Sequence, residues 1–259
     1  MEDFFVGAAD VEPSNFNGYT LIFPAVSVGQ VGQLAVDLLL ENVTPTPQKI
    51  GYIYHDSLLP MIGRDPSRNN SICTSLEVFV SHEQQLVIMQ QRAPFVKGRV
   101  PRFRAALMKW VRHVGIKQVV VLSSCSAHIC QDVHMSGSRV RYLLSDVDSA
   151  LTERFENEFG WKRFDIMRTR LNDDMQDEKV FHIPGGGIVR SLLDDCSKDN
   201  IPCVALMTFT NPGTDLVLVQ QLVEHVDSWL KVLSSPASKL KHPLSWLILL
   251  RQRGATPFF

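Results

Sequence analysis

The sequence predicts an α/β fold: a single domain with a central mixed, largely parallel β-sheet flanked by helices on both faces. Short apolar runs typical of buried strands alternate with segments whose apolar residues recur every three or four positions, as on a helix. The strongest run, residues 119–122, is unbroken, as expected for a strand covered on both faces. Since 45% of the 259 residues are hydrophobic, the chain can bury a full core.

The chain is organised around a first strand-turn-helix unit at residues 20–41. An apolar run at residues 21–26 predicts a buried strand, and apolar residues spaced three and four apart between positions 31 and 39 predict a helix. Gly29 and Gly32 allow backbone conformations closed to other residues and let the strand and the helix approach closely.

The segment after this helix predicts a second strand and a hairpin. Prolines within residues 44–47 end the helix, and residues 50–54 form a short strand. Residues 55–70 are polar and interrupted by prolines and a glycine, which indicates a long surface loop. Residues 72–80 and 86–90 are predicted to pair as an antiparallel hairpin, so the sheet is expected to be mixed.

The second half of the chain continues the alternation of strands and helices. Asp215 is placed to cap the helix predicted at residues 215–233. Gly115 is placed to end the helix predicted at residues 101–114. The predicted strands are residues 118–123, 180–183 and 203–209. The predicted helices are residues 101–114, 146–159, 188–197 and 215–233.

The domain organisation predicted from these elements is simple. We expect residues 1–17 to be a loose lead-in and residues 18–233 to form the α/β domain. Residues 234–259 are expected to form a linker, a short apolar segment and a C-terminal tail.

Charge and composition narrow the class of protein. A net charge of -1 argues against strong attraction to nucleic acid or to an anionic membrane. The acidic first residues lack the regions of a signal peptide, and no apolar run reaches the roughly 18 residues of a membrane helix. Five cysteines, an odd number, suit reduced thiols in a cytosolic or nuclear protein.

Two glycine turns lie between a strand and a helix, around Gly29 and Gly32 and at residues 185–187. Backbone amides at a helix start can cradle a phosphate, which would suit a nucleotide or a phosphorylated substrate. Neither turn has the GxGxxG pattern or a P-loop lysine. Tight turns in which a side chain would clash are therefore the favoured interpretation.

A cluster of reactive residues follows the central strand. Residues 123–125 (Ser-Ser-Cys) precede His128, Asp132 and His134, so a nucleophile activated by a histidine is one interpretation. There is no GxSxG elbow, and the residues are close in sequence, which disfavours a catalytic triad. Cys125, with Cys130 and the two histidines, could also ligate zinc, but the spacing matches no standard site. No cofactor, metal or catalytic residue is predicted.

Basic residues gather on the helix at residues 101–114 and just before it. This face is either solvated or a docking surface for an acidic partner, and the sequence leaves both open. It consists of Arg99, Arg102, Arg104, Lys109 and Arg112.

The C-terminal tail ends in Phe258 and Phe259 after a glycine and a proline. Exposed phenylalanines suit insertion into a pocket of a partner, where the terminal carboxylate can also be captured. The alternative is that both rings fold back on their own domain.

Five stretches spread over nearly the whole chain, in the same order, resemble the proteasome assembly chaperone 2 family. They are residues 24–40 (PAVSVGQVGQLAVDLLL), 50–66 (IGYIYHDSLLPMIGRDP), 119–124 (VVVLSS), 141–144 (RYLL) and 183–188 (IPGGGI). The resemblance implies a single α/β domain without cofactor or catalytic residue. It also implies a heterodimer with proteasome assembly chaperone 1 that binds proteasome α subunits, promotes α-ring formation and prevents off-pathway ring dimers.

The resemblance also gives the C-terminal tail a role. Related chaperones use a C-terminal motif of a hydrophobic residue, a tyrosine and any residue to enter pockets between α subunits. Pro257, Phe258 and Phe259 align with it but depart from it, because phenylalanine lacks the hydroxyl and proline replaces an aliphatic residue. We therefore expect these three residues to bind the partner. The remaining alternative for the whole chain is an α/β hydrolase or phosphate-binding transferase using the glycine turns and the loop after Ser123.

Overall fold

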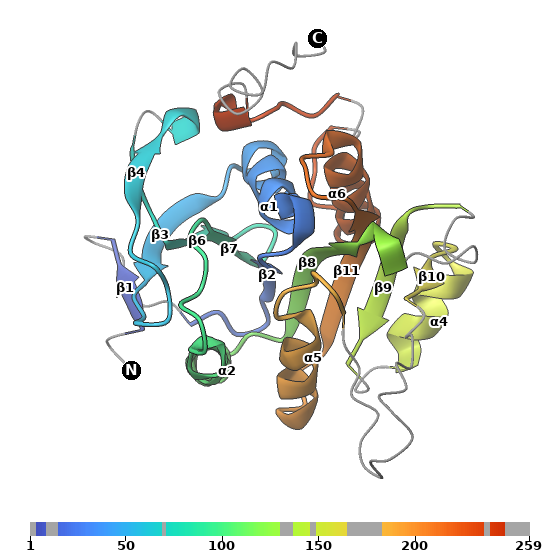
Figure 1. Cartoon of the computed structure of the whole chain (residues 1–259), viewed down its shortest axis with the longest axis horizontal. Helices are drawn as coiled ribbons and strands as arrows, with labels where there is room; N and C mark the ends of the chain where they lie inside the picture. Colours follow the sequence, from blue (N-terminus) through green and yellow to red (C-terminus); the bar gives the residue numbers. More distant parts are fainter. Residues whose placement is uncertain are drawn as a thin grey trace.

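The fold is described from a computed structural model that covers residues 4–8, 15–68, 71–129, 137–145, 149–164, 183–235 and 239–246. Within these residues, one nine-stranded mixed sheet runs through the molecule (Figure 1). In order across the sheet, its strands are β1 (Phe5–Gly7), β3 (Gln48–Ile53), β6 (Leu76–Ser81), β7 (Leu86–Gln91), β2 (Thr20–Pro24), β8 (Gln118–Ser126), β11 (Cys203–Thr210), β9 (Val140–Leu144) and β10 (Lys162–Arg163).

The other described elements lie around this sheet. Strands β4 (Ile62–Asp65) and β5 (Ser71–Thr74) pair with each other in a separate antiparallel ribbon. The helices are α1 (Val31–Asn42), α2 (Val100–Val114), α4 (Ser149–Asn157), α5 (Val189–Lys198) and α6 (Leu216–Leu230). Single 3-10 turns are η1 (Val28–Gln30), η2 (Pro66–Arg68) and η3 (Ala127–Ile129).

The centre of the sheet is parallel, and antiparallel strands extend it on both sides. β2 pairs in parallel with both β7 and β8, so Ile22 lies opposite Ile88 on one side and Val120 on the other. β8 continues in parallel with β11, whereas β6, β3, β1 and β9 are antiparallel to their inner neighbours. This confirms the predicted mixed sheet and single α/β domain.

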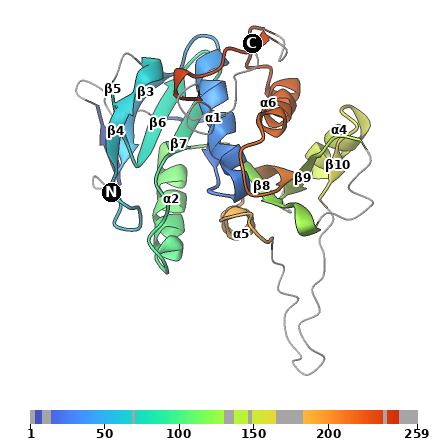
Figure 2. The ribbon, with the colours of Figure 1, turned by 45° about the horizontal axis from the view of Figure 1, so that its top comes forward.

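Helices cover both faces of the sheet (Figures 1 and 2). In β2, Leu21 and Phe23 join the apolar cluster that includes α2 and α5, while Ile22 joins the cluster that includes α1 and α6. This alternation follows from the period of two along a strand. α4 lies on the α1 face, because Phe155 packs in the same cluster as Trp229 of α6.

Close contact between α1 and the central strand explains the predicted first unit. A Cβ added at Gly32 would lie 2.2 Å from the carbonyl oxygen of Leu122 in β8, so only glycine permits this approach. The turn before α1 is tight, with Gly29 and Gln30 both in the left-handed region. The strand, turn and helix predicted at residues 20–41 are confirmed.

The predicted ends of two helices are also confirmed. Asp215 caps α6, since its carboxylate accepts hydrogen bonds from the backbone N–H groups of Val217 (3.1 Å) and Leu218 (3.3 Å). Gly115 follows α2 in the left-handed conformation with φ of 78°.

The predicted strand at residues 72–80 is wrong in one respect, because the structure divides it at Ser75 into β5 and β6. The Ser75 hydroxyl donates to the carbonyl of Leu59 (2.7 Å) and accepts from the N–H of Met61 (2.9 Å). These two bonds connect Ser75, between the two strands, to the segment that precedes β4. The prediction of a surface loop at residues 55–70 is also incomplete, because these residues include β4 and η2.

Other elements also differ from the prediction. Within the lead-in expected to be loose, Phe5–Gly7 form β1 at the sheet edge, and the rings of Phe4 and Phe16 are buried. Strands β9 and β10 were not predicted. Of the strand predicted at residues 180–183, only Ile183 is described, and it is not in a strand. No described helix is long and apolar enough to span a membrane.

Candidate protein-docking site

The three tail residues Pro257, Phe258 and Phe259 lie outside the described residues, so their predicted role stays a prediction. The structure does describe the segment that leads toward them. The side chain of Asn42, at the end of α1, holds Lys241 by two hydrogen bonds: its amide donates to the Lys241 carbonyl (2.9 Å), and its oxygen accepts from the Lys241 N–H (2.8 Å). Trp246 is 2% exposed in the cluster shared with α1 and α6. The chain is therefore anchored on the α1 face as far as Trp246.

The hydroxyls after the central strand tie loops together. Ser123 is fully buried, and its hydroxyl donates to the carbonyl of Gly186 (3.1 Å). The hydroxyl of Ser124 donates to the carbonyl of Val28 and lies 2.9 Å from that of Ser27. Hydroxyls held in this way brace the turn before α1.

The residues considered as nucleophile or zinc ligands do not converge within the described part of the chain. The Cys125 thiol is fully buried and donates to the Thr208 carbonyl at 3.7 Å. His128 lies on η3, with Nδ1 2.5 Å from the hydroxyl of Ser126. Residues 130–136, with the remaining predicted ligands, are outside the described residues. Among the described residues, no group of three His, Cys, Asp or Glu side chains could hold a metal.

The second glycine turn packs directly against the end of β2. A Cβ at Gly187 would lie 2.4 Å from the carbonyl oxygen of Val26, and Gly187 has a φ of 63°. The carbonyl of Gly185 accepts from the N–H of Val28 at 3.0 Å. The turn is thus filled by its own chain, which favours the architectural interpretation over a phosphate cradle.

Much of the predicted basic face of α2 holds α2 to α5. The guanidinium of Arg104 makes two bonds to the carboxylate of Asp195, at 2.6 and 3.1 Å. About two helical turns further along α2, Arg112 pairs with Asp199. These pairs neutralise the charge that the sequence left open to an acidic partner.

The start of α2 is neutralised only in part, because two guanidinium groups share one carboxylate. Arg99 and Arg102 both approach the carboxylate of Asp56, at 3.0 and 3.5 Å. Lys109 is the exception: among the described residues it has no acidic partner. Since Arg99 and Arg102 share a single carboxylate, the five basic residues face three carboxylates in the described part of the chain. The face therefore keeps some positive charge, and Lys109 is its unpaired ammonium there.

An apolar hollow of about 310 Å³ lies beside Lys109, between α2 and the residues that follow β3. Its wall is formed in part by the ring of Tyr54, a residue that is 69% exposed. The lining residues are Phe4, Tyr54, His55, Asp56, Ala106, Lys109 and Trp110. The hollow lies at the low end of the size of ligand pockets and suits one large apolar side chain.

His55 contributes to this hollow as a neutral ring. Its Nδ1 accepts a hydrogen bond from the N–H of Ser57 (3.1 Å), and its ring meets those of Phe4 and Phe103 edge-on. Burial lowers the pKa of His55, and the nearby Asp56 carboxylate opposes this only in part. Since the accepting nitrogen carries no proton, the contact of His55 with Asp56 is not an ion pair at neutral pH.

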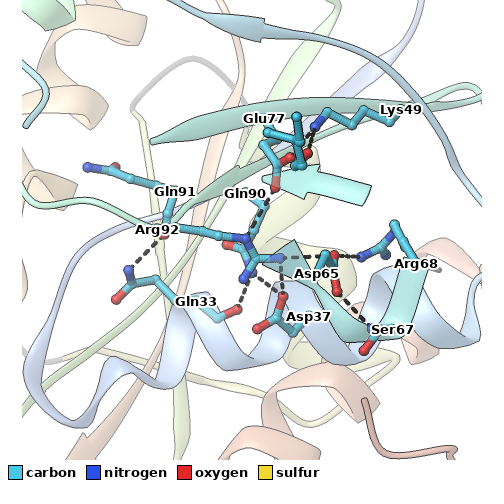
Figure 3. A network of polar contacts seen from close by, with 11 residues as sticks. Gln33, Asp37, Lys49, Asp65, Ser67, Arg68, Glu77, Gln90, Gln91 and Arg92 are labelled. Carbon is cyan, nitrogen blue, oxygen red and sulfur yellow. Dashed lines mark hydrogen bonds and ion pairs between the residues drawn. The ribbon is translucent and has the colours of Figure 1, made fainter. Parts of the chain in front are cut away.

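A buried ion-pair network lies on the α1 face of the sheet (Figure 3). Its centre is Arg92, just after β7, whose guanidinium lies 3.2 Å from Asp37 of α1, 3.2 Å from Glu77 of β6 and 3.7 Å from Asp65 of β4. One side chain therefore joins the helix, the sheet and the β4–β5 ribbon.

Two further cations complete this network. Lys49 of β3 pairs with Glu77, and Arg68 of η2 pairs with Asp65 at 2.8 Å. With Arg92 and Asp37, the network holds three cations and three carboxylates, so its formal charge is zero. Burial raises the pKa of Asp37 against the opposing effect of Arg92. Burial alone would lower the pKa of Arg92, but Asp37 and Glu77 raise it above its ordinary value.

Comparison with known proteins places the chain in a family. A sequence model described as the PAC2 family matches residues 21–242. The chain belongs to the PAC2 family. It is 36% identical to Proteasome assembly chaperone 2 of Nematostella vectensis, across 87% of this chain and 94% of the relative. It is 32% identical to Proteasome assembly chaperone 2 of Homo sapiens, across 95% of this chain and 96% of the relative.

Solved structures share the fold of this chain. Pyrococcus furiosus PbaA, an archaeal homolog of proteasome-assembly chaperone, matches with a TM-score of 0.66 and 16% identity, over 94% of both chains. Pyrococcus furiosus PbaB, an archaeal proteasome activator, matches with a TM-score of 0.63 and 13% identity, over 97% of this chain and 99% of that one. At these identities the likeness shows the PAC2-family fold alone.

Family membership also decides between the two predicted kinds of function. The curated relatives are chaperones by name, a non-enzymatic role, which confirms the prediction that this PAC2-family chain is not an enzyme. Sequence reasoning missed the apolar hollow and the Arg92 network, because their residues come from segments far apart in the chain. The only local signal was Asp37, an acidic residue among the many apolar residues of α1.

Proposed function

We propose that this PAC2-family chain is a proteasome assembly chaperone subunit. Paired with proteasome assembly chaperone 1, it binds proteasome α subunits, promotes formation of the α ring and prevents off-pathway ring dimers. The observation that carries the proposal is the identity of 31–36% to relatives named Proteasome assembly chaperone 2, with nearly the full length of each relative covered in most cases.

The proposed mechanism is surface complementarity without chemical turnover. Two features of the structure support it: the glycine turn and hydroxyls after the central strand are occupied by contacts within the chain, and an open apolar hollow lies elsewhere, beside α2. A hollow of this kind takes an apolar anchor residue from a protein partner, which is the usual core of a protein interface.

We further propose that the protein works in the cytoplasm and the nucleus. The support is chemical: the four cysteines in the described part of the chain are buried thiols, as expected in a reducing compartment. They are Cys73, Cys125, Cys196 and Cys203.

The proposed role of Pro257, Phe258 and Phe259 is to enter pockets between α subunits. The apolar rings and the terminal carboxylate suit such pockets, even without the tyrosine hydroxyl. The anchoring of residues 239–246 on α1 by Asn42 and Trp246 supports this proposal, because it fixes the point from which the tail extends.

Reconstitution from purified components tests the proposal. The chain is mixed with proteasome assembly chaperone 1 and with proteasome α subunits, and complexes are resolved by size-exclusion chromatography and native mass spectrometry. We expect a one-to-one heterodimer that binds α subunits, increases the yield of single α rings and lowers that of ring dimers. An unchanged distribution of rings with both chaperones present would refute it.

A further inference from the structure

The outer face of the β4–β5 ribbon is apolar and exposed. Ile62 lies opposite Thr74 and Arg64 opposite Ile72 in the antiparallel register, so all four side chains share one face. Ile62 is 76% exposed and Ile72 59% exposed. The other face carries the buried Asp65, which joins the Arg92 network.

This face continues into the hollow beside α2. Thr74 lines a second hollow of about 170 Å³ together with Met61 and Tyr54, and Tyr54 also lines the first hollow. Tyr54, Leu59, Ile62 and Ile72 are four of the six large apolar side chains exposed in the described part of the chain. We call these four residues and the two hollows the Tyr54 surface. In Figures 1 and 2, β1, β4 and α2 lie toward the end of the molecule that is opposite α4 and β10.

The Tyr54 surface carries uncompensated positive charge. Arg64 on the ribbon and Lys109 at the first hollow have no acidic partner among the described residues. The neighbouring cations Lys49, Arg68 and Arg99 are each paired with a carboxylate. A second copy docked about a two-fold axis would bring like charges together, whereas a partner with carboxylates around an apolar ridge would be complementary.

The surface is also held in place before any partner binds. Lys49 donates a hydrogen bond to the carbonyl of Ile72 (2.7 Å), and the guanidinium of Arg68 stacks 4.8 Å from the ring centre of Phe79. The Arg92 network fixes the buried side of the ribbon. A preformed surface loses little conformational freedom on association, which favours binding.

We propose that the Tyr54 surface is the docking site for the second chaperone subunit of the heterodimer, a different protein that presents an apolar ridge rimmed by carboxylates. The inference rests on the proposed function, which supplies such a partner. Permanent complexes have more apolar interfaces than transient ones, so a surface with four exposed large apolar residues fits the lasting partner better than the α subunits held during assembly.

A pair of double variants tests this assignment. Ile62→Glu/Ile72→Glu places two negative charges on the ribbon, and the matched control Val217→Glu/Leu244→Glu places two negative charges on exposed apolar residues elsewhere, which are 64% and 52% exposed. Binding to purified proteasome assembly chaperone 1 is measured by isothermal titration calorimetry, with thermal unfolding of each variant as the check on folding. We expect the ribbon variant to bind about 30-fold more weakly and the control to bind within about twofold of the wild type.

A charge reversal gives a second, independent readout. Lys109→Glu is expected to weaken the heterodimer and to flatten the dependence of its association rate on salt, because an attraction to carboxylates is removed. A wild-type-like rate and salt dependence would contradict the predicted rim of carboxylates.

The outcomes separate this inference from the proposed function. If the wild-type chain does not bind proteasome assembly chaperone 1, both fail. If the wild type and a folded ribbon variant bind it equally, the function stands and the docking site is wrong. If the ribbon variant still binds proteasome assembly chaperone 1 but no longer binds α subunits, the surface is a site for α subunits and the inference is overturned. The inference is also overturned if the variant still forms the heterodimer but no longer self-associates, because the surface is then a contact between copies of this chain.

Discussion

The guanidinium of Arg92 lies 3.2 Å from the carboxylate of Asp37, a residue 55 positions earlier in the chain. The pair connects the end of β7 to the middle of α1, and the same guanidinium reaches Glu77 and Asp65. The side chains of all four residues are at most 20% exposed, so their charges stabilise the fold only while they remain together.

Replacing Arg92 with methionine is therefore expected to lower the free energy of unfolding by about 3 kcal/mol, because Asp37 and Glu77 would lose their shared partner in a buried place. Urea denaturation followed by circular dichroism measures the change. Arg64→Met, on the exposed face of the ribbon, is the matched control and should change stability by no more than about 0.5 kcal/mol. Equal effects of the two variants would show that the network does not carry stability.

Gly32→Ala is expected to destabilise the protein, although alanine is ordinarily the better helix former. The added Cβ would lie 2.2 Å from the Leu122 carbonyl in β8, so α1 must move off the sheet, at a cost of about 3 kcal/mol. Gly160→Ala is the comparison, because a Cβ added at Gly160 would meet open space. The substitution should therefore lower the free energy of unfolding by only about 1 kcal/mol, the cost of placing alanine in the left-handed conformation of this residue. Thermal melts of both variants check the order, and a Gly32→Ala protein as stable as the wild type would contradict the close contact.

These cases show what local sequence pattern can and cannot predict. The unbroken run in β8 and the stripe of α6 are local signals, and both elements are present, although α6 ends at Leu230 and not at residue 233 as predicted. β9 was missed because this buried strand contains Arg141 and Tyr142, whose polar groups interrupt the apolar run expected of a buried strand. β4 was missed because Gly63 and the flanking Pro60 and Pro66 are typical of a loop, and β5 was predicted only as the beginning of the strand at residues 72–80.

The candidate docking site was less predictable than the fold for a similar reason. The basic residues of α2 were found in the sequence, but their neutralisation by Asp56, Asp195 and Asp199 depends on segments brought together only by folding. The exposure of Ile62 and Ile72 depends on the ribbon's register, which the sequence did not indicate. The sequence offered two candidate binding elements, the basic face of α2 and the C-terminal tail, and neither includes Tyr54, Ile62 or Ile72.

His225 is expected to make stability fall in mild acid. Its Nδ1–H donates to the Gln221 carbonyl (2.7 Å), and its Nε2 lies 3.1 Å from the Ser138 hydroxyl, an arrangement that suits the neutral ring. Burial lowers the pKa of His225 below its ordinary value of 6.5, so the unfolded chain binds the proton more readily. The contribution of His225 to stability is therefore complete above pH 6.5 and is lost as the pH falls below it.

The measurement is the urea midpoint at several pH values for the wild type and for His225→Gln. The variant should show a flatter decline below pH 6.5, whatever its stability at neutral pH. His55 titrates in both proteins, so its effect cancels in the difference. Parallel declines would show that His225 is protonated equally in the folded and unfolded chains.

Asn42→Ala is expected to loosen the segment that leads to the C-terminal tail. The variant loses both hydrogen bonds to Lys241, each worth about 1 kcal/mol, so local opening should become about 30-fold more frequent. Limited digestion with trypsin, which cuts after Lys239 and Lys241, measures the opening rate. Asn42→Asp keeps the acceptor for the Lys241 N–H and should give an intermediate rate; equal rates for all three proteins would contradict the anchoring role.

The tail itself gives the last prediction. Deleting Pro257, Phe258 and Phe259 should weaken binding to α-ring intermediates and leave the heterodimer intact, because the proposed dimer contacts lie on the Tyr54 surface. Phe258→Tyr should instead strengthen α-ring binding, since it supplies a hydroxyl whose hydrogen bond is worth about 0.5–1.5 kcal/mol, or roughly a 2- to 12-fold change in Kd. Surface plasmon resonance with immobilised α-ring intermediates measures both variants. If the deletion variant binds as tightly as the full chain, the tail does not dock. If the deletion weakens binding but Phe258→Tyr has no effect, the pocket offers no hydrogen-bond partner for the hydroxyl. Insertion would then depend on the ring and the terminal carboxylate alone.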